Sequence, residues 1–163
     1  MRKIYTLFAL LFLGIYGTNA QTTLISPTGD GGFETGATIA LNNWTAVNAA
    51  TNTWQAGTAA TAFAGARGAY VSNNGGTTWA YTVGTLQTSH FYRDIVVPAG
   101  EANIPLSFQW KGNGESGFDR LLVYTAPTSV TPVANSPLSS STTITGATLV
   151  FTQPLFAQAT YVS

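Results

Sequence analysis

Few residues of this chain could perform acid–base or nucleophilic chemistry. The sequence has no cysteine and one histidine, which excludes a thiol nucleophile and a zinc site rich in His or Cys. Asp94 follows His90 by four residues, but on a strand the two side chains would lie roughly 13 Å apart, too far for a hydrogen bond. A Ser-His-Asp triad would need another carboxylate, supplied by the fold. We expect His90 to be a partly exposed strand residue and the protein not to be an enzyme.

Two pairs of carboxylates stand four residues apart, Asp30 with Glu34 and Glu115 with Asp119. Glycoside hydrolysis needs two facing carboxylates at a defined separation, which spacing along the chain does not establish. Both pairs lie near glycine turns, so turn capping or ion pairing explains them better than catalysis. The basic residues available for such ion pairs are Arg93, Lys111 and Arg120.

Charged and aromatic residues nevertheless indicate where a ligand could bind. The chain beyond residue 20 has only ten charged residues, and four of them lie in the connection from Lys111 to Arg120. Tryptophan and tyrosine are also platforms on which the flat apolar faces of sugar rings stack. Trp79 and Tyr81 could form such a platform, although burial in the core is the commoner fate of these residues. The candidate ligand-binding residues are Trp79, Tyr81, Tyr92, Arg93, Glu115 and Asp119.

Strands must position these residues, because no segment shows a sustained helical period. Apolar residues alternate with other residues from Ile104 to Trp110, and the apolar run Leu121–Tyr124 follows the charged connection. This pattern predicts an antiparallel pair of strands with a long connection. Shorter predicted strands cover residues 44–47, 53–56, 69–72, 77–83, 91–97, 147–152 and 159–163. Many short strands at spacings of about ten residues predict an all-β sandwich or barrel.

Two further features concern the core and one long connection. Trp44, Trp54 and Trp110 lie in predicted strands, so we expect them in the core. Residues 126–146 are rich in Pro, Ser and Thr, and prolines recur there every five residues, which excludes a central strand. We interpret this segment as an ordered excursion within one domain.

The first twenty residues have the features of a secretory signal peptide. Arg2 and Lys3 precede an apolar run over residues 4–16, which is too short to span a membrane. We expect cleavage after Ala20 and a secreted or cell-surface bacterial protein, with an N-terminal membrane anchor as the alternative. Residues 21–28 would form a lead-in, and residues 29–163 a single domain.

The composition of the exported part limits its partners. Without Arg2 and Lys3 the chain has four basic and six acidic residues, a net charge of −2, which argues against nucleic acid or an anionic membrane surface. A cysteine-free core is typical of a bacterial exported module. We expect a glycan or an extracellular protein as partner, besides neighbouring domains of a longer chain.

A series of motifs follows one another along the chain in an order that resembles a known family. The motifs are Gly29–Glu34, Asn43–Trp44, Trp54–Gly57, Ala69–Gly76, Ser89–Asp94, Leu106–Gly112 and Phe118–Tyr124. Together they resemble the choice-of-anchor J module, which is related to the cleaved-adhesin and MAM-like domains. Such modules occur in large secreted surface proteins of Bacteroidetes, often beside fibronectin type III repeats and a type IX secretion signal.

The resemblance implies a jelly-roll β-sandwich of two antiparallel sheets. It also implies a structural calcium near Phe33-Glu34, with Glu34 and Asp30 as possible ligands. Modules of this family would continue for one or two strands beyond Ser163, so the jelly roll is expected to be truncated at its C-terminal end. An unpaired edge would then make this chain less stable than a longer one.

These observations predict a non-catalytic binding or adhesion module of a larger secreted or surface protein. One alternative is a structural spacer that positions neighbouring domains. The other is an accessory domain of a secreted hydrolase whose catalytic part is absent here.

Overall fold

The computed structural model describes residues 22–136, 146–154 and 158–163; the predicted signal peptide lies outside these ranges. The regular secondary structure of the described chain is almost entirely β, with one 3-10 turn, η1 (Ala40–Asn42). Its strands are β1 (Thr45–Val47), β2 (Thr53–Gly57), β3 (Gly68–Ser72), β4 (His90–Tyr92), β5 (Trp110–Gly112), β6 (Arg120–Thr125), β7 (Thr148–Pro154) and β8 (Gln158–Val162). Within those residues, no helix has the length and apolar character needed to cross a membrane.

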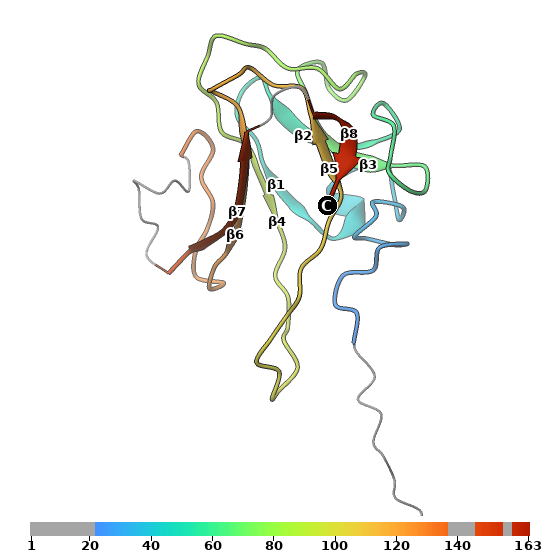
Figure 1. The fold of residues 1–163 in the computed structure, drawn as a ribbon, viewed down its shortest axis with the longest axis vertical. Helices are drawn as coiled ribbons and strands as arrows, with labels where there is room; N and C mark the ends of the chain where they lie inside the picture. The colour runs from blue at the N-terminus through green and yellow to red at the C-terminus, as the bar shows by residue number, and fades with distance from the viewer. Residues whose placement is uncertain (1–21, 137–145, 155–157) are drawn as a thin grey trace, which may run out of the picture.

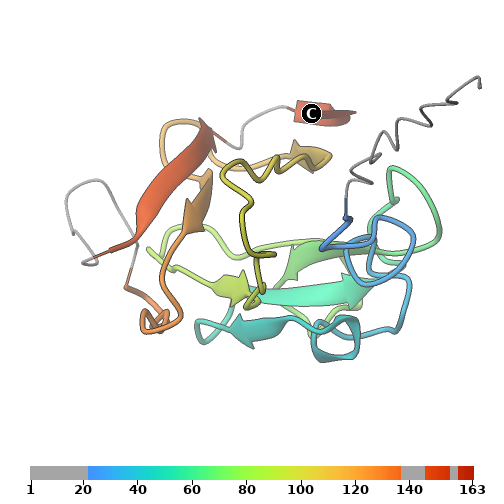
Figure 2. The ribbon, with the colours of Figure 1, turned by 90° about the horizontal axis from the view of Figure 1, so that it is seen from below.

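The strands pair as four antiparallel ladders, β1–β4, β2–β3, β5–β8 and β6–β7. In Figure 2 the β1–β4 and β2–β3 ladders form one layer, and the β5–β8 and β6–β7 ladders lie over it. The predicted all-β fold of antiparallel strands is therefore confirmed, and two layers are consistent with a β-sandwich. The strand connections of a jelly roll remain a prediction.

An aromatic cluster joins the two ladders of the first layer. The ring of Phe91, in β4, lies 4.6 Å from that of Trp54, in β2, and 5.1 Å from that of Trp44, just before β1. Phe33 completes the cluster, at 6.1 Å from both Trp44 and Phe91. Each indole N–H is satisfied, because Trp44 donates to the Asp30 carbonyl and Trp54 to the Ser89 carbonyl, both at 3.0 Å. Trp44 and Trp54 are half-buried in this cluster, which is the core of the first layer.

Buried polar side chains replace part of the apolar core. Asn42 has no exposed surface, and its amide donates to the carbonyls of Gly36 and Thr38 and accepts from the Thr35 N–H. Ser72 is equally buried, and its hydroxyl oxygen accepts the Gly76 N–H at 3.0 Å. These side chains close turns that apolar contacts alone would not hold.

The predicted strand over residues 104–110 is wrong for most of its length. β5 begins only at Trp110, and the side chains of Ile104 and Leu106 are 52% and 55% exposed. The segment between β4 and β5 projects away from the sheets (Figure 1). The partner of β5 is β8, whose register stops at Trp110 opposite Val162, so the backbone before Trp110 pairs with no strand of the described residues. An alternating pattern produces a buried face only where a second layer covers it.

The predicted pairing of residues 104–110 with 121–124 is also wrong, although residues 121–124 do lie in a strand. They belong to β6, which pairs with β7 through six register positions. Leu121–Tyr124 are half-buried, not buried on both sides. The prediction failed because β7 lies more than twenty residues further along the chain, beyond any turn signal that could indicate the pairing.

The predicted strand over residues 77–83 is absent, and the one over 91–97 is reduced to β4. Asn52 explains the first difference: its side-chain amide donates to the Thr82 carbonyl at 2.9 Å, and its carbonyl oxygen accepts the Thr82 N–H at 2.8 Å. A side chain therefore pairs with backbone groups that a neighbouring strand would otherwise engage. Val83 is 61% exposed and Trp79 is 44% exposed, so Trp79, Tyr81 and Val83 do not form a buried face.

The described part of the predicted excursion, residues 126–136, is held against β4. The Asn135 N–H donates to the Thr88 carbonyl at 2.9 Å, and the Thr88 N–H donates to the Asn135 side chain at 3.3 Å. His90 Nε2 lies 3.1 Å from the Val133 carbonyl oxygen and 3.2 Å from that of Ser136. His90 is thus a half-buried strand residue, as the sequence predicted. Its ring contacts the excursion and helps to hold it against β4. Residues 137–145 of the excursion lie outside the described residues.

Candidate functional site

Lys111 is the centre of a surface built from four separate segments. Its ammonium nitrogen donates to the Thr61 carbonyl at 2.9 Å and lies 5.0 Å from the ring centre of Trp79 and 4.7 Å from that of Tyr161. β5 supplies Lys111 and β8 supplies Tyr161, whereas Thr61 and Trp79 lie on the connections after β2 and β3. Two aromatic rings and a carbonyl oxygen therefore hold the cation in a fixed place.

The aromatic residues around Lys111 are open to solvent. Trp79 is 44% exposed and Phe63 is 62% exposed. The Phe63 ring packs edge-on against Tyr161 at 5.6 Å, and the Tyr161 hydroxyl donates to the same Thr61 carbonyl that Lys111 uses. We call Thr61, Phe63, Trp79, Lys111 and Tyr161 the Lys111 surface.

Acidic residues border the Lys111 surface beyond Trp79. Burial, a hydrogen bond with the Asp119 carboxylate and the negative charges of Asp119 and Glu115 raise the pKa of Tyr81 to about 12. Asp119 Oδ2 also accepts the Glu115 N–H at 2.6 Å, which closes the turn of the charged connection. The structure thus brings four of the six predicted ligand-binding residues into one region: Trp79, Tyr81, Glu115 and Asp119.

The other two predicted residues, Tyr92 and Arg93, belong to a different part of the molecule. Arg93 Nη1 lies 2.6 Å from Asp30 Oδ2, and its guanidinium stands 5.5 Å from the ring centre of Trp44. Tyr92 ends β4 opposite Thr45. Arg93 therefore joins the N-terminal segment to the first layer through its ion pair with Asp30. Such an ion pair is the alternative to ligand binding that the sequence had allowed.

The two carboxylates suggested for calcium have separate partners. Asp30 is paired with Arg93, and Glu34 Oε1 accepts the backbone N–H groups of Ala66 and Arg67 at 2.8 and 2.7 Å. These two hydrogen bonds lower the pKa of Glu34 below its ordinary value, and the one from the Arg67 N–H has the larger effect. No group of three or more His, Cys, Asp or Glu side chains gathers within residues 22–136, 146–154 and 158–163. Calcium binding near Glu34 stays a prediction.

Sequence reasoning missed three of the five residues of the Lys111 surface. Thr61 lies in a stretch of alanine and glycine and contributes only its carbonyl oxygen, which any residue would supply. Tyr161 lies one hundred residues after Thr61, and no local pattern indicates that β8 pairs with β5. Phe63 is a single aromatic residue in a segment predicted as a loop.

Comparisons of this chain with family models, with curated proteins and with solved structures found no match, so its function is inferred from the geometry above.

Proposed function

We propose that this protein is a non-catalytic extracellular module that binds a glycan through the Lys111 surface and the acidic residues beside it. The observation that carries the proposal is the exposed Trp79 ring beside a fixed ammonium group. A sugar stacks one face of its ring on an indole, while its hydroxyl groups need donors and acceptors at the edge. Lys111 supplies donors, and Asp119 and Glu115 supply acceptors.

A binding role is further supported by how the carboxylates are engaged. Asp30 forms an ion pair with Arg93, Glu34 accepts two backbone N–H groups, and Asp119 caps the Glu115 N–H. Each of these contacts stabilises a turn or joins two segments, which is the structural use of a carboxylate and not the facing pair that glycoside hydrolysis requires. Export to the cell surface or the medium, and membership of the choice-of-anchor J family with its jelly-roll connections, remain part of the proposal.

A glycan array probed with the full chain tests the proposal. We expect retention of a subset of glycans by the wild-type protein and its loss in Trp79→Ala. Val96→Ala is the matched control, because Val96 is 88% exposed and lies in the projecting segment between β4 and β5. Absence of any glycan bound by the wild-type protein would favour a protein ligand or a structural spacer instead. Equal binding by Trp79→Ala would contradict a glycan seated on the Lys111 surface.

A further inference from the structure

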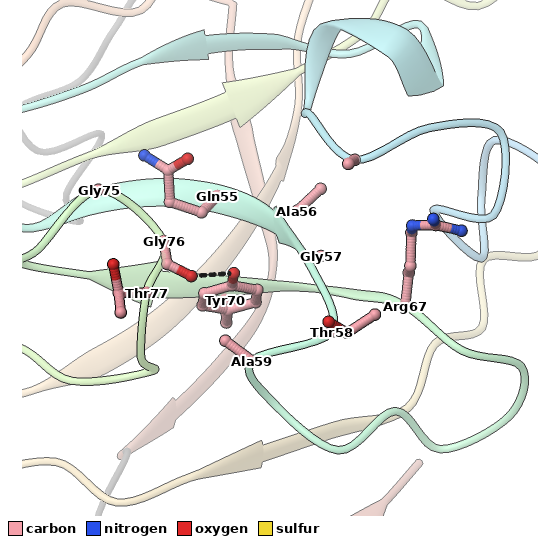
Figure 3. A pocket seen from close by; sticks show the side chains of 11 residues that line it. Gln55, Ala56, Gly57, Thr58, Ala59, Arg67, Tyr70, Gly75, Gly76 and Thr77 are labelled. Carbon is pink, nitrogen blue, oxygen red and sulfur yellow. Dashed lines mark hydrogen bonds between the residues drawn. The ribbon is translucent and has the colours of Figure 1, made fainter.

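A polar pocket of about 370 Å³ lies at the end of the β2–β3 ladder. Figure 3 shows Arg67 at one end of the pocket, Tyr70, Gly76 and Thr77 at the other, and Gly57 and Thr58 between them. Ligand pockets in proteins commonly have volumes of roughly 300–1,000 Å³, so this one has room for a single small ring.

Missing side chains create the pocket. Gly57 pairs with Gly68 across the ladder, two positions from the pair formed by Gln55 and Tyr70 and therefore on the same face, so the sheet surface carries no side chain at this position. A Cβ added at Gly57 would lie 3.1 Å from the Tyr70 hydroxyl oxygen. That hydroxyl donates to the Gly76 carbonyl at 2.8 Å and holds the Gly75–Thr77 turn in place (Figure 3). Glycine backbone therefore forms part of the pocket lining, at Gly57, Gly75 and Gly76.

Arg67 is the charged residue among those that line the pocket, and its guanidinium forms only a long ion pair. Its nearest carboxylate oxygen, Glu34 Oε2, is 4.0 Å from Nη1, and Glu34 Oε1 is already occupied by backbone N–H groups. Arg67 Nε is buried and has no hydrogen-bond partner among the described residues. About one third of the side chain is exposed, so the outer N–H groups remain accessible. A guanidinium in this state is suited to a two-pronged contact with a carboxylate.

The pocket and the Lys111 surface share two segments of chain. Residues 57–59 line the pocket, and two residues later the Thr61 carbonyl binds Lys111. Residues 75–77 line the pocket as well, and two residues later Trp79 stacks on Lys111. The pocket that holds Arg67 and the Lys111 surface are therefore neighbours along two segments of the chain, and Tyr81, beside Asp119 and Glu115, follows Trp79 by two residues.

We infer that the Arg67 pocket binds the carboxylate of an acidic sugar, a uronic acid unit of a glycan whose neighbouring unit stacks on Trp79. The inference rests on the proposed function and names its ligand class. Arg67 is the basic group of this pocket, and its ion-pair partner Glu34 stands 4.0 Å away, so the outer N–H groups can still bind a ligand carboxylate.

The test measures calorimetric binding of uronate oligosaccharides of the galacturonate, glucuronate and mannuronate series, each beside its methyl ester. Esterification removes the charge and keeps the sugar. We expect at least one acid to bind about tenfold more tightly than its ester, and Arg67→Gln to abolish this preference. Arg67→Gln keeps the backbone N–H that Glu34 accepts, so the loop is preserved. Arg120→Gln removes an equal charge from an exposed position of β6 and should retain the preference.

Each outcome separates the two proposals. Equal binding of acid and ester, or a preference that survives in Arg67→Gln, would overturn the pocket assignment and leave glycan binding intact. An acid preference that depends on Arg67, together with equal affinities of the wild-type protein and Trp79→Ala for the acid, would support the pocket and contradict the role of the Lys111 surface. Failure of every uronate and every ester to bind would contradict the pocket assignment, and the glycan array then decides the proposed function by itself.

Discussion

Arg93 and Asp30 form the shortest ion pair in the described chain, with 2.6 Å between Nη1 and Oδ2, and they join segments 63 residues apart. Both side chains are largely buried, at 15% and 18% exposure, and the guanidinium also faces Trp44. The pair attaches the N-terminal segment to the aromatic cluster of the first layer. Its energetic role can be measured through the pH dependence of stability.

Asp30→Asn should destabilise the protein and remove part of its acid sensitivity. The hydrogen bond from Arg93 is the main cause that holds the pKa of Asp30 below its ordinary value of 3.8. A lowered pKa in the folded state stabilises the protein above pH 3.8, and this stabilisation is lost as the pH falls through the folded-state value. At pH 7 the substitution should reduce the free energy of unfolding by roughly 2 kcal/mol, the usual contribution of a hydrogen bond to a charged group.

Urea denaturation of wild type and Asp30→Asn between pH 7 and pH 3 checks this expectation. The difference in unfolding free energy between the two proteins should shrink below pH 4, since Asp30 then binds a proton in the unfolded chain before it does in the folded protein. Asp94→Asn, at an exposed position, is the control. A difference that stays constant down to pH 3 would show that the charge of Asp30 contributes nothing.

Asp119→Asn should lower the pKa of Tyr81 from about 12 toward 10. The negative charge of Asp119 opposes ionisation of the neighbouring phenol, and its removal makes the tyrosinate easier to form. Burial of the ring remains, so the pKa should stay above 10. The measurement is a pH titration of the Tyr81 ring carbon signals by NMR. An unchanged titration midpoint would mean that Asp119 and Tyr81 are not in contact.

Lys111→Met should lower stability by about 1 kcal/mol, because exposed cation–π contacts are each worth about 0.5–1 kcal/mol and Lys111 makes two. Methionine keeps the length and the apolar stem of lysine, so packing changes little. Denaturant unfolding with Arg120→Met as control measures the difference. The Trp79 fluorescence of Lys111→Met should also change, since the charge over its ring is gone, whereas equal spectra and stability would contradict the described arrangement.

Calcium is expected to bind near Glu34 in wild type and not in Glu34→Gln. Glutamine keeps a side-chain oxygen for the N–H groups of Ala66 and Arg67 and removes only the charge that a hard cation needs. The loop should therefore stay folded while the metal is lost. Calorimetric titration with calcium is the measurement, and absence of heat in both proteins would remove calcium from the account.

The sequence predicts the strands whose register and turns are local, and misses features that depend on distant partners. β2 and β3 follow from their β-branched and aromatic residues and from the turns that bound them, and the prediction for residues 53–56 and 69–72 is confirmed. Residues 104–110 have an equally clear alternating pattern, yet Leu106 is exposed, and none of the strands in the described part of the chain pairs with it. Trp79 and Asp119 could be nominated from composition. Their common location could not, because it depends on the Lys111 ammonium group and on a β8 tyrosine fifty residues away.

The most direct test of the account is calorimetric titration of the full chain with the glycan that the array identifies, in wild type, Trp79→Ala and Val96→Ala. An aromatic stacking contact contributes roughly 0.5–1.5 kcal/mol, so Trp79→Ala should weaken binding by up to about tenfold. Val96→Ala should bind as wild type does. Equal dissociation constants for all three proteins would contradict a ligand seated on the Lys111 surface.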